Sequence, residues 1–203
     1  THNITGVGFQ PDWVWIKSRS SGVQPHNFFD SVRGVNKVLY PNNTDQEDDD
    51  SANGSLTSFD SDGFTVGGYF NRVNQSGETF VSWNWKASGS TASNTDGTNI
   101  TSTVSANTTA GFSIVSYTGS GTISDTVGHG LGTTPNWIIL KNRDTGTSAF
   151  IVHHSGLSSG FNMQLQSNGD HFNSTGQGHL GTVGSSTFGF VAGSSGNDLL
   201  YLK

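Results

Sequence analysis

The most distinctive hydrophobic pattern in the chain occurs twice, each time directly after a proline. Residues 13–17 (WVWIK) follow Pro11 and residues 137–141 (WIILK) follow Pro135, a constant offset of 124 (135 − 11 and 141 − 17). Alternate side chains of a strand point to opposite faces, and both faces of these two runs are apolar. The pattern therefore predicts two central β-strands, each packed above and below.

Further segments repeat around these strands. Residues 27–34 (NFFDSVRG) resemble 149–156 (AFIVHHSG), an alignment that pairs Phe28 with Phe150 and reduces the offset to 122. Residues 56–67 read as a hairpin with an Asp-Gly turn, echoed by 188–193. The glycine pair at 6 and 8 returns at 130 and 132, which predicts a tight bend before each central strand. The chain is therefore expected to contain an internal repeat.

Composition sets the boundaries of the two repeats. Residues 88–110 are almost entirely Ser, Thr, Asn and Gly without a periodic apolar face, and they predict a linker between a first β-sandwich repeat (1–87) and a second (111–203). Only 31% of the residues are hydrophobic and 28 are Gly, so an all-β fold with short strands and thin cores is expected. We also expect contacts with neighbouring copies to contribute to stability.

One strand of the repeat has no counterpart. Residues 111–119 (GFSIVSYTG) predict a strand that opens the second repeat, and nothing equivalent precedes the first. An unpaired sheet edge is a template for pairing with another strand. We expect the edge beside residues 13–17 to be covered, either by residues 100–104 folding back or by a segment of a neighbouring subunit.

Charge and residue usage narrow the function. The net charge is −6 with nine scattered Lys and Arg, which argues against nucleic-acid binding. There is no Cys, and no apolar run approaches the roughly 18 residues of a membrane span. The chain begins with Thr1, which favours a fragment or a processed chain.

An acidic loop and the histidines are the candidates for metal binding. The loop contains Asp45, Glu47, Asp48, Asp49 and Asp50. A solvated loop is the preferred interpretation, and calcium is the alternative because carboxylate oxygens are its ligands, although the EF-hand spacing is missing. No other cofactor is expected. Adjacent strand residues face opposite sides, so the His153-His154 pair does not suit one ion, and His171 stands apart.

No catalytic residues stand out. Glycosidases need two carboxylates across a cleft. The four carboxylates considered for this role, Asp30, Asp60, Asp62 and Glu78, all fall on predicted turns or strand ends, and no two of them form an evident pair. The chain has no Gly-x-Ser-x-Gly elbow between a strand and a helix. We therefore expect a protein that is not an enzyme.

The tryptophans offer the best candidate for ligand binding, because sugars stack on exposed indoles. Core packing is the preferred interpretation for the four on apolar strand patterns, Trp13, Trp15, Trp83 and Trp137. Trp85, at the end of its predicted strand, is the indole expected to be exposed and to bind a sugar.

The motifs together resemble a known type of module. They are PDWVWIK, FDSVRG, LTSFDSDGFTVG, SGETFVSWNWK, GFSIVSYTG and VGHGLGTTPNWIILKNR, and the match extends over nearly the whole chain apart from residues 87–110. This set resembles a tandem module of structural proteins of tailed bacteriophages. The resemblance implies two concanavalin-like or jelly-roll antiparallel β-sandwiches and a location on the virion surface, and it brings no catalytic residues. The second repeat departs from it in its shortened end and in His153-His154.

The expected function is that of a bacteriophage fibre, tail or capsid-decoration component. Its expected partners are other copies of itself and other virion proteins, with host-surface polysaccharide as a further option. The alternative is an extracellular carbohydrate-binding or adhesin module secreted by a bacterium.

Overall fold

The computed structural model describes the chain except for residues 69–70, 159, 170–171, 174–179, 191–197 and 203. The described part consists of antiparallel sheets, and its only helix is the four-residue α1 (Asn71–Asn74). The expected all-β fold is therefore confirmed.

The strands divide between the two halves of the chain. The first half contains β1 (His2–Ile4), β2 (Trp13–Ser18), β3 (Asn27–Asp30), β4 (Lys37–Val38), β5 (Asp48–Asp49), β6 (Leu56–Asp60), β7 (Gly63–Val66) and β8 (Phe80–Trp85). The second half contains β9 (Ala92–Asn94), β10 (Ser102–Asn107), β11 (Phe112–Ser116), β12 (Thr126–Gly128), β13 (Trp137–Asn142), β14 (Ile151–His154), β15 (Phe161–Gln164), β16 (Phe172–Asn173), β17 (Leu180–Val183), β18 (Thr187–Phe190) and β19 (Asp198–Leu202).

The order of strands in the sheets repeats between the halves. The sheet β3-β2-β8 corresponds to β14-β13-β19 within an eight-stranded sheet, and β1-β7-β6 corresponds to β12-β18-β17. The register repeats too, because Trp13 lies opposite Asp30 and Trp137 lies opposite His154, both offset by 124. The offset of 122 predicted for this segment is therefore wrong: pairing with the central strand fixes the register, and the two phenylalanines at 28 and 150 are not equivalent positions.

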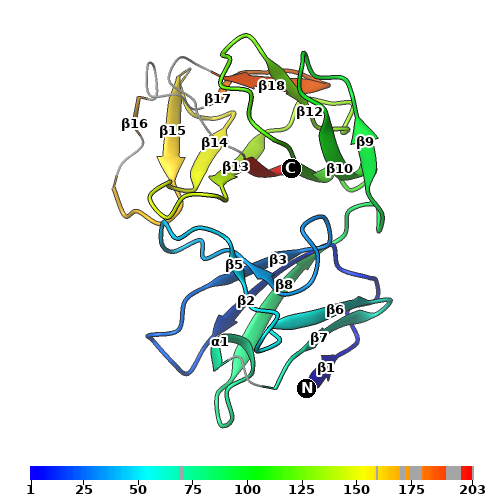
Figure 1. Cartoon of the computed structure of the whole chain (residues 1–203), viewed down its shortest axis with the longest axis vertical. Coiled ribbons are helices and arrows are strands. Elements are labelled where there is room, and N and C mark those ends of the chain that lie inside the picture. Colours follow the sequence, from blue (N-terminus) through cyan, green and yellow to red (C-terminus); the bar gives the residue numbers. More distant parts are fainter. Residues whose placement is uncertain (69–70, 159, 170–171, 174–179, 191–197, 203) are drawn as a thin grey trace.

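Three hydrophobic clusters separate four stacked layers (Figure 1). Val14 and Ile16 of β2 point into a cluster shared with the sheet β1-β7-β6, and Trp13 points the other way. Ile138 and Leu140 of β13 likewise point toward the sheet β12-β18-β17. The prediction that the central strands are packed on both faces is confirmed. In Figure 1 the layers run from β6 and β7 at the bottom to β18 at the top.

The glycine bends before the central strands are also present. Gly6 and Gly8 have φ of +85° and +84°, and Gly130 and Gly132 have φ of +72° and +70°. These left-handed conformations favour glycine over residues that carry a Cβ. In the first repeat the Asp62 carboxylate accepts hydrogen bonds from the N–H of Gly6 (3.0 Å) and Gly8 (2.6 Å), which ties the bend to the turn between β6 and β7.

The segment 88–110, predicted as a linker, instead contains β9 and β10, which pair within the eight-stranded sheet. Two of its serines, both in β10, are buried with satisfied hydroxyls: Ser102 Oγ donates to the carbonyl of Gly128 (2.7 Å), and Ser105 Oγ shares a hydrogen bond with Ser88 (3.0 Å). Val104 adds an apolar contact to the hydrophobic cluster between β13 and the sheet β12-β18-β17. A polar composition therefore concealed a buried strand, because hydrogen-bonded Ser can lie inside a fold.

The unpaired edge of the first repeat is not where we expected it. Residues 13–17 belong to β2, which is flanked on both sides by strands of its own repeat, β3 and β8. Residues 102–107 form β10 in the second repeat and do not fold back on the first. The prediction that residues 100–104 cover β2 is wrong. The open edge lies one strand further out: β8 is last in its sheet, whereas its counterpart β19 continues to β11, β10 and β9.

Candidate functional site: the inter-repeat core and the open edge of β8

The middle hydrophobic cluster joins the two repeats. Trp13, which is fully buried, stacks on Phe112 of the second repeat with ring centroids 5.9 Å apart. Phe28 meets Phe150 edge to face at 5.9 Å. Aromatic pairs in such geometries add about 0.5–1.5 kcal/mol beyond the burial of their area. The two central sheets thus share one core, which we call the inter-repeat core, with these buried members: Trp13, Phe28, Leu39, Ala87, Phe112, Ile114, Ile139, Phe150 and Val152.

A buried carboxylate fixes the chain at the edge of this core. Asp12 is fully buried, and its Oδ2 accepts hydrogen bonds from the N–H of Ala87 (2.7 Å) and Gly89 (3.1 Å), where the chain passes into the second repeat. Its Oδ1 accepts from Ser31 Oγ (2.9 Å). Asn136 is the counterpart of Asp12, and both repeats have the same main-chain hydrogen bond, from Ser31 N–H to Asp12 O and from Ser155 N–H to Asn136 O (2.8 Å each). The sequence analysis missed Asp12, and the contrast between PDW and PNW was the available signal.

Polar contacts continue the junction on the side of the acidic loop. Glu47 accepts hydrogen bonds from Arg33 of its own repeat (3.1 Å) and from Arg143 of the other (3.3 Å). Lys141, only 1% exposed, donates through Nζ to the carbonyls of Thr44 (3.1 Å) and Ser148 (2.7 Å). A buried ammonium is tolerated because carbonyl oxygens replace its hydration. Loop and second repeat are thereby held together.

The structure does not bring the acidic side chains of this loop to one point. Besides Glu47, each of them has its own partner: Asp45 accepts from Asn43, Asp48 from Tyr40, Asp49 from Lys37 and Asp50 from Asn53. Asp50 Oδ2 is buried without a hydrogen-bond partner, and burial raises the pKa of this carboxyl. Across the described ranges no group of three His, Asp or Glu is placed to hold a metal ion. In this fold the acidic loop contacts the second repeat through Glu47 and the carbonyl of Thr44. Calcium binding stays a prediction, and the separated carboxylates do not favour it.

The carboxylates considered for hydrolysis are likewise separate. Asp30 pairs with Arg33, Asp60 accepts a hydrogen bond from Thr65, and Asp62 caps the glycine bend. Glu78 accepts a hydrogen bond from Ser18 Oγ (2.7 Å). Each carboxylate serves a local structural contact.

The histidines also divide among environments. His153 is half-buried and burial, with the neighbouring His154, lowers its pKa, whereas the His154 side chain is exposed. His171 lies outside the described residues. A histidine that the sequence analysis did not single out has the clearer contact: His26 Nδ1 accepts a hydrogen bond from Trp15 Nε1 (2.8 Å). Burial, followed by the charge of Lys17, lowers the pKa of His26, and the bond requires its neutral form.

The indole expected to be exposed is not the exposed one. Trp85 is half-buried against Trp13, with ring centroids 4.2 Å apart, and packs on the inter-repeat core. Trp83 is 44% exposed and lies beside Trp15, with centroids 5.2 Å apart. Both indoles share one face of β8, since Trp83 is opposite Trp15 and Trp85 is opposite Trp13. The shift arises because the second repeat covers the Trp85 end of β8 and leaves the Trp83 position open.

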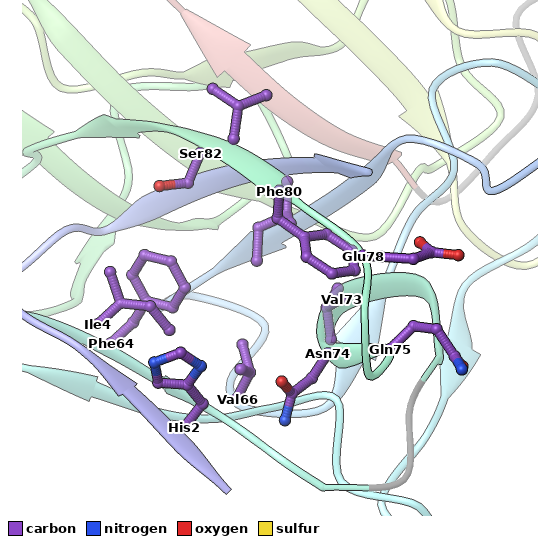
Figure 2. Close-up of a pocket in the computed structure, with 12 residues that line it drawn as sticks. His2, Ile4, Phe64, Val66, Val73, Asn74, Gln75, Glu78, Phe80 and Ser82 are labelled. Atoms are coloured by element: carbon purple, nitrogen blue, oxygen red, sulfur yellow. The ribbon is translucent and has the colours of Figure 1, made fainter. Parts of the chain in front are cut away.

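A pocket of about 300 Å³ with a mixed polar and apolar lining lies on the other face of β8. Figure 2 shows Phe80 and Ser82 of β8 above it, Ile4 and Phe64 below it, and Val73 of α1 at one end. The pocket thus opens between the two sheets of the first repeat, beside the unpaired edge. In the second repeat the corresponding core contains residues of the additional strands and the segments beside them, namely Ile100, Val104, Val115 and Tyr117.

No helix in the described part is long and apolar enough to cross a membrane.

The chain matches a known domain family. Neither curated proteins nor solved structures gave a match. The family model described as a domain of unknown function, DUF7483, matches residues 1–200, and the chain therefore belongs to this family.

Proposed function

We propose that the chain is a non-enzymatic structural module of a bacteriophage virion surface, a component of a fibre, tail or capsid decoration built from two tandem concanavalin-like or jelly-roll units. The observation that carries the proposal is the inter-repeat core. Two repeats that bury Trp13, Phe28, Phe112 and Phe150 against one another form one stiff body. Stiffness along the repeat axis is what a spacer or decoration element of an assembled particle requires.

The surface composition supports the same role. The chain combines a net charge of −6 with many Gly, Ser and Thr residues, a composition that suits an abundant exposed protein. The open edge of β8 provides a place for contacts with further chains.

Immunogold labelling tests this function. Phage particles would be purified from the source culture and stained with an antibody raised against this chain, with labelling after preadsorption on the recombinant protein as the control. We expect gold on fibres, tails or capsids. Particles that carry no label, while the protein is found free in the culture supernatant, would refute the proposal.

A secreted carbohydrate-binding module is the second candidate, and the exposed Trp83 is the observation that favours it. A glycan array decides between the two. Saturable binding that disappears in Trp83→Ala, in a variant that keeps its fold, would favour the carbohydrate module. Trp85→Ala is the matched comparison: because Trp85 packs on Trp13, we expect it to lower stability instead of removing a ligand contact.

A further inference from the structure

The open edge of β8 fits one particular partner. We propose that β8 pairs antiparallel with β8 of a second copy of this chain, with Ser82 opposite Ser82 of that copy. The two β3-β2-β8 sheets would then form one continuous sheet of 3 + 3 strands about a two-fold axis. This inference rests on the proposed assembly of copies, for which it names the surface.

The backbone N–H and C=O groups of every second residue of β8 point away from β2. The carbonyls of Thr79 and Trp85 accept hydrogen bonds from Arg19 N–H (2.7 Å) and Asp12 N–H (2.8 Å), at either end of β2. In an antiparallel ladder every second residue faces the partner strand. Residues 79, 81, 83 and 85 therefore face β2, and residues 80, 82 and 84 present their N–H and C=O groups outward. No other strand in the described residues pairs with β8.

The register between the two β8 strands decides how many of these outward groups are paired. Only outward-facing residues can exchange hydrogen bonds across the new edge. If Ser82 lies opposite Ser82 of the second copy, Phe80 lies opposite its Asn84, and all three outward residues of both strands are paired. Any shift along the strand leaves at least one of them unpaired. The self-pairing register with the most hydrogen bonds is thus the one centred on Ser82.

Opposite charges flank the two ends of β8. The six residues of β8 carry no charge, but Glu78 lies two residues before the strand and Lys86 lies one after it. In the Ser82-centred register these positions fall opposite each other (78 + 86 = 82 + 82). A two-fold axis makes the contact twice, so each dimer gains two pairs of opposite charges. Opposite charges directly across a strand pair are stabilising, and like charges are destabilising.

The second copy would also cover side chains on both faces of β8. Trp83, the exposed indole, would lie opposite Val81 of the second copy on one face of the sheet. On the other face, Asn84 of the second copy would lie opposite Phe80, beside the pocket between the two sheets. The second repeat shows the same position filled, because β11 pairs antiparallel with β19, the counterpart of β8. The fold therefore accommodates an antiparallel strand at this edge.

Sedimentation velocity of the full chain at about 0.15 M salt, where surface charges act only within about 8 Å, tests the pairing. We expect a monomer–dimer equilibrium. Ser82→Pro removes an outward N–H that makes no bond to β2, so the monomer should keep its strand signal by circular dichroism while the dissociation constant rises at least about tenfold. A folded chain that stays monomeric at the highest concentration, or a dimer that Ser82→Pro leaves unchanged, would overturn the proposal.

Charge reversal provides a second test that does not depend on proline. Glu78→Lys and Lys86→Glu each place like charges opposite one another, so each variant alone should dimerise at least about tenfold more weakly. Mixing the two variants restores opposite charges at both ends and should restore a dimer. Variants that dimerise as well alone as mixed would refute this register.

The outcomes separate this inference from the proposed function. Particles that carry the label, from a chain whose dimer does not involve β8, would refute the pairing and leave the virion role standing. A β8 dimer of a chain absent from particles would do the reverse. Capture at β8 of a different polypeptide, with no self-pairing, also counts against the second copy as the partner.

Discussion

At the scale of single residues, buried polar groups at the edge of the inter-repeat core hold neighbouring segments of the chain together by hydrogen bonds. Asp12 is the clearest case, because one buried carboxylate ties the end of β3 and the passage into the second repeat to β2. Buried carboxylates remain charged only where donors replace their hydration. Such a residue contributes to stability through the groups it satisfies.

We predict that Asp12→Ala lowers the free energy of unfolding by about 3 kcal/mol or more, because the N–H groups of Ala87 and Gly89 lose their carboxyl acceptor. Asp12→Asn, which introduces the residue found in the second repeat, keeps one acceptor oxygen and should cost about 1 kcal/mol. Chemical denaturation of the two variants measures both values. Equal stability of the alanine variant and the unmodified chain would contradict the role of Asp12.

Three histidines with lowered pKa values predict a pH dependence of stability: His26 and His153 are half-buried, and His129 is fully buried. Burial lowers the pKa of His26, His129 and His153 below the ordinary value of 6.5, so the unfolded chain binds more protons than the folded one between the two values. Stability is full above pH 6.5 and falls as the pH drops through that window. We expect the melting temperature to decrease from pH 7.5 toward about pH 5. His26→Gln can accept the Trp15 hydrogen bond without titrating and should reduce the slope; an unchanged slope would contradict the contribution of His26.

At the scale of elements, sequence patterns identified the strands that have large apolar side chains. The WVWIK and WIILK runs are central strands, the hairpin over 56–67 contains β6 and β7, and residues 111–119 contain β11. The pattern failed for β9, which is short and largely exposed, and for β10, because its hydrogen-bonded serines do not show in hydropathy. It also missed the buried Asp12 and Lys141, since their partners are main-chain groups that only the folded chain brings together.

Hydrogen exchange measures whether residues 102–107 form a strand or a linker. We predict that the amides of β10 that face β11 exchange as slowly as those of β11, because both strands lie within the eight-stranded sheet. The turn at 108–110 is the internal reference and should exchange fast. Fast exchange throughout residues 102–107 would show that the segment behaves as the linker that its composition predicts.

At the scale of the whole molecule, the repeats are joined by their most aromatic faces. The sequence predicted that the central strands pack on both sides, but it could not say that the second side faces the other repeat. The same ambiguity explains Trp85: strand patterns cannot tell a sugar-binding indole from one covered by a neighbouring unit. The expected contribution of neighbouring copies to stability stays a prediction.

Differential scanning calorimetry of the full chain tests the shared core most directly. The repeats share the contacts of Trp13 and Phe28 with Phe112 and Phe150, so we predict one heat-absorption peak. Phe150→Ala, a substitution in the second repeat alone, should move that entire peak to lower temperature, with a loss of about 3–5 kcal/mol. Two separate peaks, of which Phe150→Ala moves only one, would contradict a single body formed by both repeats.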